Sequence, residues 1–495
     1  MRETRAGPLK LVQVVLGGGL SFYLDLLQFK FTRGLARRPQ TKALDDWWAW
    51  AAYRSGLYRS VSDYCWKGRF RHGGMAVAVS LAACGRSTEA REIVTQLIAR
   101  FGTRRYLVPL ADAIAPFDAE LASVILEGLD APPVLRAALL FRMARGQDAE
   151  RVLVAALEKN EHRRFPELLL LANNVIGGTP DVQLGRLNSY LESKGLSPVG
   201  LTEPTRPPGA SNLVSASSLP KVDGPLLSVL MTTFSTADRV GEAIRSILGQ
   251  TYRNLELIVA DDASDDGTAE IVQAMAREDR RVKYLRMPCN VGTYVAKSIA
   301  FEHALGEFVT CHDSDDWSHP LRFERQIAPL LKNPRLVATT SQWVRIQDDG
   351  VFYARPVHPL ARLNPASPMF RRELVAREMG LWDLVRTGAD SEFHARLRLV
   401  FGRRAVKRIA LPLAFGAHRP NSLMTASDTG YCASGMSPVR LDYWEAWTHW
   451  QIAELRAGRS PRLEPRRERR QIEAPPQIVV PRERIDQCYA ELCGR

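Results

Sequence analysis

The sequence predicts an all-α region followed by an α/β domain with a parallel sheet. From about residue 43 to 198 the pattern is helical, and its helix-breaking signals recur about every 30 residues, the scale of helix-hairpin repeats. Beyond about residue 226, apolar strands alternate with helices of about 10–15 residues, which is typical of a parallel α/β sheet. A chain of 495 residues is also too long for one ordinary domain. We therefore divide the chain into segments 1–42, 43–200, 201–225, 226–436 and 437–495.

The first segment, residues 1–42, places an apolar stretch between two basic clusters. The stretch from Leu11 to Leu27 contains three consecutive glycines and Asp25, so it is a poor transmembrane span. Such a segment either lies on an anionic membrane surface or packs as a first helix on its own domain, and both readings stay open. The flanking cations are Arg2, Arg5 and Lys10 before the stretch, and Lys30, Arg33, Arg37 and Arg38 after it.

The helical region, residues 43–200, contains two segments that resemble each other. "LAACGRSTEAREIVTQLI" and "LFRMARGQDAERVLVAAL" each read as a helix end, a Gly turn, an acidic residue, an Ala and an apolar run. Ala90 and Ala149 are the alanines after the acidic residue, where a small side chain lets two helices pack closely. We expect a short α-solenoid similar to tetratricopeptide arrays, with an irregular helical bundle as the alternative.

Residues 201–225 are rich in Pro, Ser and Gly and predict a linker. The strands expected after the linker are 226–234, 255–262, 282–287 and 307–313, and the helices between them are 239–250, 267–279 and 295–305. In parallel sheets, ligands bind at the carboxyl ends of the strands. These ends carry polar side chains, so we expect a site along this edge; the residues are Thr232-Thr233, Asp261-Asp262 and Asp313-Ser314-Asp315-Asp316.

The run from Asp313 to Asp316 brings carboxylates together at a strand end, where they repel one another unless a cation lies between them. Mg²⁺ and Mn²⁺ prefer such oxygen ligands and often share them with substrate phosphates. The apolar strand before the run and the loop after it favour this reading over an ordinary surface loop. One carboxylate of the pair Asp261-Asp262, at the same edge, is able to accept a hydrogen bond from the ring N–H of a pyrimidine.

A proton acceptor is expected in "TGADSEFHARL". A group that removes a proton from a hydroxyl must be an ionised carboxylate or a neutral His within hydrogen-bond reach, and Asp390 or Glu392 would serve. The alternative is a pair of carboxylates favoured by a helix N-terminus. The two residues point about 200° apart on a helix, so only one of them can face the site. His418 is either structural or a third metal ligand beside the carboxylates.

The net charge of +13 favours acidic partners such as phosphorylated substrates or anionic lipid. No nucleic-acid-binding motif is visible, so we expect no nucleic-acid partner. The seven cysteines are scattered without a CxxC pair, which fits a reducing cytosol. Residues 437–495 predict an aromatic-rich helix followed by a solvated basic tail.

Three stretches together resemble the family 2 inverting glycosyltransferases of the GT-A fold. They are "LSVLMTTFSTADRVGEAIRSILGQTYRNLELIVADDASDDGT", "NVGTYVAKSIAFEHALGEFVTCHDSDDWSHP" and "GADSEFHARL". The resemblance covers about residues 226–425 and implies a GT-A nucleotide-diphospho-sugar transferase domain. It implies that Thr232 and Asp262 bind the nucleotide base, that Lys297 lies near the phosphates, and that Asp313 faces the ribose or the metal. It further implies that Asp315 holds the metal, with His418 as a further metal or phosphate contact, and that Asp390 is the catalytic base.

The resemblance implies a metal-dependent inverting glycosyltransferase in cell-surface or capsular polysaccharide biosynthesis. The implied cofactor is Mn²⁺ or Mg²⁺, the donor is a nucleotide sugar with a preference for UDP-sugars, and the acceptor is a glycan or a lipid-linked glycan. We expect a cytoplasmic protein, with contact at the inner face of the membrane as an open alternative, and a protein partner on the helical repeats. The alternative is a scaffold protein that binds partners through its helical repeats and whose transferase domain is degenerate.

Overall fold

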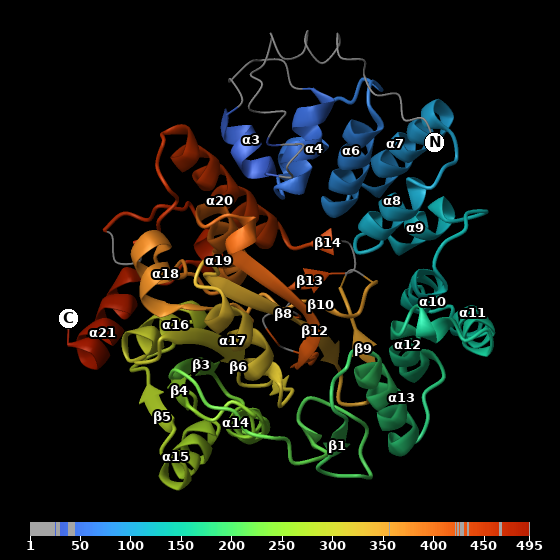
Figure 1. Ribbon diagram of the computed structural model, residues 1–495. Helices are drawn as coiled ribbons and strands as arrows, with labels where there is room; N and C mark the ends of the chain where they lie inside the picture. Colours follow the sequence, from blue (N-terminus) through green and yellow to red (C-terminus); the bar gives the residue numbers. More distant parts are fainter. Residues whose placement is uncertain are drawn as a thin grey trace.

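The computed structural model describes residues 25, 30–37, 45–355, 357–420, 422, 425, 430–432, 435–464 and 468–494. The first half of the chain forms an arc of helices along one side of an α/β domain (Figure 1). The helices of the arc are α3 (Phe31–Arg37), α4 (Asp46–Arg54), α5 (Tyr58–Ser62), α6 (Arg71–Ala83), α7 (Ser87–Phe101), α8 (Leu107–Ile114), α9 (Ala119–Ile125), α10 (Pro133–Arg142), α11 (Gly146–Glu158), α12 (Glu167–Val175) and α13 (Pro180–Ser193).

The two segments with similar sequences form matching helix hairpins, α6–α7 and α10–α11. The second helix of each hairpin begins after an arginine, and that arginine bonds the acidic residue three positions on. Arg86 Nε donates to Glu89 at 2.7 Å, and Arg145 Nε donates to Asp148 at 2.8 Å. The following alanines, Ala90 and Ala149, are fully buried, as expected for close helix contacts. The helix-hairpin reading is confirmed for this pair, and the likeness to tetratricopeptide arrays stays a prediction.

The segment predicted as a linker, residues 201–225, does join the two regions, but it carries ordered structure. Its first half closes a hairpin between β1 (Val199–Leu201) and β2 (Leu213–Ser215). The Asn212 side chain lies inside the loop of this hairpin and bonds the backbone of Glu203, Arg206 and Pro207. A Pro-rich composition therefore marks a fixed loop in this chain rather than a free tether.

The α/β domain is built on a sheet with the strand order β5-β4-β3-β6-β11-β8-β12-β7, with β9 and β10 paired to β8. The first four positions are parallel, and β11 runs antiparallel to β6. The strands are β3 (Leu227–Thr233), β4 (Leu255–Asp261), β5 (Val282–Arg286), β6 (Phe308–Asp313), β7 (Trp317–Ser318), β8 (Ala338–Ile346), β9 (Phe352–Tyr353), β10 (Arg362–Leu363), β11 (Met369–Arg371) and β12 (Val406–Ala417). The predicted strands of the parallel half are confirmed, while the later half of the sheet is mixed.

Helices cover both faces of this sheet because alternate residues of the buried strands point to opposite sides. In β3, Val229 and Met231 pack with one group of helices, and Leu230 packs with the other. The first group is α14 (Val240–Leu248), α15 (Thr268–Glu278) and α17 (Arg322–Lys332). The second is α16 (Thr293–Glu302), α18 (Arg372–Met379), α19 (Ala389–Val400), α20 (Pro438–Arg456) and α21 (Arg482–Cys493).

The C-terminal segment is part of the core of the domain. We expected a solvated basic tail after the aromatic helix, but Arg470 forms a two-oxygen contact with Asp383 at 2.7–2.8 Å. Ile472, Ile478 and Cys488 are buried beneath α16 and its neighbours. Among the residues placed after α20, basic side chains therefore form specific pairs while the apolar ones complete a hydrophobic cluster.

The helical arc and the α/β domain share one hydrophobic core. A single cluster of buried residues runs from the arc into β7, β8, β12 and α20. At one end of the arc, Glu445 of α20 accepts from the backbone N–H groups of Arg59 and Ser60. At the other end, the Asn174 amide exchanges two hydrogen bonds of 2.7 Å with the backbone of Phe352. The arc is thus fixed to the domain at both ends.

Most of the predicted N-terminal segment, residues 1–42, lies outside the described residues, so its contact with a membrane stays a prediction. Of that segment, α3 is described, and Arg456 of α20 donates to the Leu35 carbonyl at 3.1 Å. Within the part of the chain that is described, no helix combines the length and the apolar character needed to cross a bilayer.

The joint between the arc and α20 provides a stability test. Gly56 has φ +90°, and an added Cβ there would overlap the Trp444 indole. Gly128 also has a positive φ, of +71°, but open space around it. We expect Gly128→Ala to cost about 1–2 kcal/mol, the ordinary cost of the left-handed conformation. Gly56→Ala should cost about 1–3 kcal/mol more, because the joint is overpacked.

Denaturant unfolding of the two variants and the wild type measures both costs. Equal losses of stability in the two variants would show that the contact between the arc and α20 contributes nothing.

Candidate active site

The parallel strands bring the predicted polar residues to one edge of the sheet. Thr232 of β3 lies in register with Asp313 of β6, and Thr233 lies in register with Asp261 of β4. The chain reverses its direction of strand addition between β3 and β6, which makes a crevice at their carboxyl ends. The Thr232 hydroxyl contacts the Thr293 hydroxyl at 2.6 Å, so the first turn of α16 lies at this crevice.

Asp262 organises the loop that leads into α16. Its two carboxylate oxygens accept the backbone N–H groups of Val291 and Gly292, both at 2.7 Å. Burial raises the pKa of Asp262 to about 6, and the two N–H donors oppose that rise. Arg386 closes the other side of this loop by donating to Asn290 at 2.7 Å. The predicted base-binding role of Asp262 stays a prediction; the contact seen in the structure is with the loop.

Lys297 of α16 lies between two of the predicted site carboxylates. Its ammonium nitrogen is 3.5 Å from Asp313 Oδ1 and 3.5 Å from Asp390 Oδ2, and its side chain is 1% exposed. Burial alone would lower the pKa of Lys297, but Asp390 and Asp313 outweigh it and raise the pKa well above its ordinary value. The group is therefore a fixed positive charge at neutral pH.

Asp390 lies in the first turn of α19 and faces the strand ends. Besides Lys297, it accepts a hydrogen bond of 3.2 Å from the Tyr294 hydroxyl. Burial raises the pKa of Asp390, and Lys297 acts in the opposite direction. Glu392 points elsewhere, as expected for a residue two positions on: it is fully buried, and Arg396 donates to both of its oxygens at 2.8 and 2.9 Å.

Asp315 and Asp316 are held by the segment that follows β12. Arg419 Nε donates to Asp315 Oδ2 at 3.0 Å, and the Ala417 N–H donates to Asp316 Oδ1 at 3.0 Å. Burial raises the pKa of Asp316 well above its ordinary value, and the neighbouring Asp315 adds to the rise. Arg345 is buried within the electrostatic reach of these carboxylates, which oppose the lowering of its pKa by burial.

His418 contacts an aromatic ring rather than the carboxylates. Its imidazole stacks on Tyr353 with ring centroids 3.7 Å apart and planes at 3°. Burial lowers the pKa of His418 to about 4, and Arg345 and Arg142 lower it further, so the ring is neutral at pH 7. Among the described residues, no three His, Cys, Asp or Glu side chains gather closely enough to hold a metal ion, so the set Asp313, Asp315 and His418 is not brought together.

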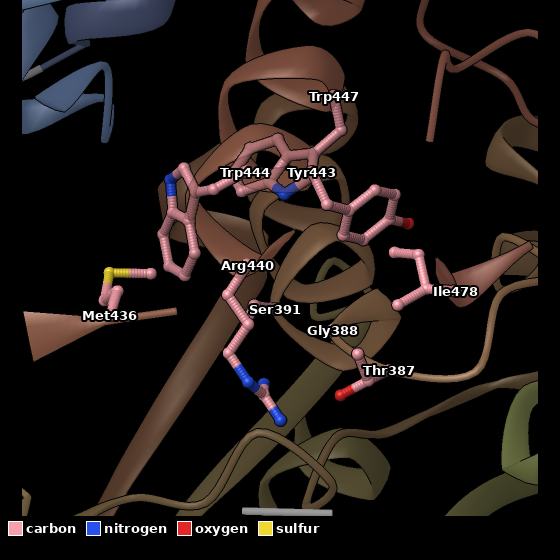
Figure 2. Close-up of a pocket in the computed structure, with 9 residues that line it drawn as sticks. All are labelled: Thr387, Gly388, Ser391, Met436, Arg440, Tyr443, Trp444, Trp447 and Ile478. Atoms are coloured by element: carbon pink, nitrogen blue, oxygen red, sulfur yellow. The ribbon is translucent and has the colours of Figure 1, made fainter. Parts of the chain in front are cut away.

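A narrow crevice adjoins Asp390 between α19 and α20 (Figure 2). Gly388 and Ser391, on either side of Asp390, form one wall, and Arg440 extends from α20 past Ser391. The aromatic side chains of Tyr443, Trp444 and Trp447 line the opposite wall. The crevice encloses ≈ 20 Å³, which is room for about one water molecule.

Several residues of this site were not predicted from the sequence. Tyr294 and Arg419 contact the predicted carboxylates and Arg345 lies within their electrostatic reach, yet none of the three stands within a recognisable pattern of charged residues. The only available signal was proximity: Tyr294 lies three residues before Lys297, and Arg419 directly follows His418.

Comparison with known proteins places this site in a family. Residues 228–388 match the model of the family "Glycosyl transferase family 2". An uncharacterized glycosyltransferase of Haemophilus influenzae is 37% identical over 126 residues, which are 26% of this chain and 50% of the relative. A putative teichuronic acid biosynthesis glycosyltransferase of Bacillus subtilis, TuaG, is 31% identical over 124 residues, 25% of this chain and 49% of the relative. The chain thus spans about half the length of these curated relatives.

A third relative is the GalNAc(5)-diNAcBac-PP-undecaprenol beta-1,3-glucosyltransferase of Campylobacter jejuni. It is 41% identical over 93 residues, which are 19% of this chain and 30% of the relative. Among solved structures, S. aureus TarS 1-349 in complex with UDP-GlcNAc is similar at 18% identity and a TM-score of 0.36. This similarity covers 47% of this chain and 65% of that one. The matched residues include the strand ends, Lys297 and the loop before Asp390, so this chain contains a glycosyl transferase family 2 domain.

Proposed function

We propose that this chain is an inverting glycosyltransferase that moves a sugar from a nucleoside-diphosphate sugar to a hydroxyl group of a glycan or lipid-linked acceptor. The observation that carries the proposal is the cluster of Asp313, Lys297 and Asp390 at the carboxyl edge of the parallel strands, in and beside the family-matched residues. Three functions of a transferase site lie together there: oxygen ligands at a strand end, a fixed cation, and a carboxylate on a separate helix.

In the proposed reaction, Asp390 is the base. It accepts the proton of the acceptor hydroxyl as that oxygen attacks the anomeric carbon from the face opposite the leaving diphosphate. One displacement of this kind inverts the anomeric configuration. The base must be ionised, and the contact with Lys297 favours the ionised form against the effect of burial. Base assistance typically contributes about 10²–10⁴-fold to the rate.

Lys297 and the strand-end residues orient the donor in this proposal. The Lys297 cation faces the position of the diphosphate, where it offsets negative charge that grows as the bond to the sugar breaks. Thr232 and Asp262 line the nucleotide side of the crevice. The preference for a UDP-sugar rests on the expected pairing of Asp262 with a pyrimidine N–H and stays a prediction.

The proposed divalent cation, Mn²⁺ or Mg²⁺, would be held by Asp315 and Asp313. Their carboxylate oxygens are the ligands that such ions prefer, and they suit an ion shared with substrate phosphates. The described residues offer no third ligand beside them, so diphosphate oxygens and water would complete the coordination. When bound, the ion supplies positive charge to the leaving diphosphate.

We propose a role in cell-surface or capsular polysaccharide assembly. Support comes from the names of two relatives, one for teichuronic acid biosynthesis and one for a beta-1,3-glucosyltransferase acting on a GalNAc(5)-diNAcBac-PP-undecaprenol. A cytoplasmic location, with the basic N-terminal segment at the inner face of the membrane, belongs to the same proposal. The basic net charge of the chain supports it.

Asp390 and Glu392 provide a matched pair of variants for the base. Asp390→Asn keeps the size of the side chain but removes the basic oxygen. We therefore expect kcat to fall by about 10²–10⁴-fold with donor affinity close to wild type, while the melting temperature falls because buried Lys297 loses one of its two carboxylate partners. Glu392→Gln disturbs a buried ion pair with Arg396, so it should lower the melting temperature and change kcat much less. Transfer assays with nucleotide sugars and calorimetry measure the two effects, and an active Asp390→Asn enzyme beside a dead but stable Glu392→Gln enzyme would reverse the assignment.

The metal assignment is tested at Asp315. Asp315→Ala should abolish transfer and Mn²⁺ binding in the presence of UDP, while the fold is retained because this side chain is partly exposed at the rim. Glu373→Ala removes a carboxylate that is 83% exposed in the same domain and should change neither property. Calorimetric titration of Mn²⁺ and transfer in excess EDTA are the measurements. Full activity of the wild type in EDTA would contradict metal dependence.

A further inference from the structure

A large groove lies where the helical arc meets the α/β domain. It has a volume of ≈ 710 Å³, within the range of about 300–1,000 Å³ that is typical of ligand sites. The start of α7, the turn between α8 and α9 and the end of α10 form most of its wall, and β9 contributes Tyr353. We call it the arc groove; the lining residues used below are Thr88, Arg91, Asp118, Glu120, Arg142 and Tyr353.

The lining of the arc groove has the chemistry that recognises sugars. Thr88 supplies a hydroxyl, Arg91 supplies hydrogen-bond donors and Glu120 supplies acceptors. Tyr353 adds a partly exposed side chain whose hydroxyl can both donate and accept hydrogen bonds. A lipid chain would require a continuous apolar lining, and a nucleic acid would require an excess of basic groups, whereas the groove holds two carboxylates, Asp118 and Glu120, beside Arg91 and Arg142. Mixed polar groups beside an aromatic ring favour an uncharged or weakly charged oligosaccharide.

The inner end of the arc groove, at Tyr353, is linked to the candidate active site by a short relay of contacts. The ring of Tyr353 stacks on His418 at 3.7 Å, and the next residue, Arg419, bonds Asp315 at 3.0 Å. On the neighbouring strand, the guanidinium of Arg345 is 5.9 Å from the centre of the Tyr353 ring. The groove is thus separated from the strand-end carboxylates by single side chains.

Both regions of the protein hold Tyr353 in place. Arg142 of the arc lies 5.4 Å from the centre of its ring and donates to the adjacent Ala354 carbonyl at 2.6 Å. The Asn174 amide fixes the backbone of Phe352 on the other side. The groove is therefore preformed, which reduces the entropy lost when a ligand binds.

We propose that the arc groove binds the acceptor as an oligosaccharide of several sugar units. The sugars behind the reacting hydroxyl lie beside Tyr353, and more distant ones lie against the starts of α7 and α9. This inference rests on the proposed function in one respect, that the bound glycan is the acceptor. It assigns the helical arc to substrate binding rather than to a separate protein partner.

The test uses a variant that fills the groove without touching its supports. Thr88 is exposed at the start of α7, so Thr88→Trp should block the groove while the melting temperature stays at the wild-type value. Tyr353 is a poorer choice because its loss would loosen the joint itself. Thr95→Trp is the control, since Thr95 is exposed on the same helix but outside the groove.

The probe is an array of bacterial polysaccharide fragments of one to eight sugar units, incubated with the full chain in the absence of donor. We expect the wild type and Thr95→Trp to retain fragments longer than two units, and Thr88→Trp to lose at least tenfold in affinity for them. Equal retention by all three proteins, or no retention by the wild type, would overturn the proposal.

Release of nucleotide from UDP-sugars without acceptor, measured on the wild type and Thr95→Trp, separates the two levels of inference. If nucleotide is released and Thr88→Trp binds glycan as well as the wild type, the proposed transferase activity is supported and the proposed role of the arc groove is contradicted. If Thr88→Trp weakens glycan binding but no nucleotide is released from the UDP-sugars, the proposed transferase activity is contradicted. The arc groove would then be a glycan-binding site alone.

Discussion

The ammonium group of Lys297 connects the elements on which the site depends. It reaches Asp313 at the end of β6 and Asp390 at the start of α19 from its own place in the middle of α16. Without this cation, the two carboxylates would approach each other in a partly dry crevice, where their mutual repulsion disfavours ionisation. Removing one partner from such an arrangement typically costs about 3–5 kcal/mol. The same charge therefore orders three elements and prepares the electrostatics of the site.

Helix α20 extends this order to the rest of the chain. On one side, Gln451 donates to Glu392 and Tyr443 donates to Asp383, which fixes α20 against the elements around Asp390. On the other side, Glu445 and Thr448 bond the backbone around Ser55 and Arg59 in the arc. The helical arc is thus connected to the helix of the proposed base through one intervening helix. This arrangement explains why the two regions share a hydrophobic core.

The site has two halves of different origin. One half comes from β3, β4, β6 and α16, which lie in the family-matched residues and close together along the chain. The other half comes from α19, α20 and the segment after β12, which lie outside that match. The residues that match the family model are therefore in contact with elements outside the match, and these elements adjoin Asp390.

Local patterns in the sequence were sufficient for the first half. Alternation of apolar strands and amphipathic helices predicts the parallel sheet, and the polar residues after β3, β4 and β6 predict its functional edge. The similar sequences around Ala90 and Ala149 predict the paired hairpins. This prediction succeeds because each hairpin is stabilised by contacts between helices that are adjacent in sequence. The opposite orientations of Asp390 and Glu392 follow from helix geometry alone.

Contacts between distant segments were decided only by the tertiary structure. The composition of residues 201–225 predicts a flexible linker, and that of the basic C-terminal segment predicts a solvated tail. Neither composition reveals the distant residues that the segment contacts in the fold. His418 illustrates the same limit: the sequence leaves open a structural His or a metal ligand, and only the fold places its ring on Tyr353. The sequence by itself determined the alternating strands and helices of the parallel half, the paired hairpins and the identity of the charged residues, since these depend on neighbours in the chain. Which charge meets which partner, as with Lys297 between Asp313 and Asp390, depended on packing that brings residues far apart in sequence within a few ångströms.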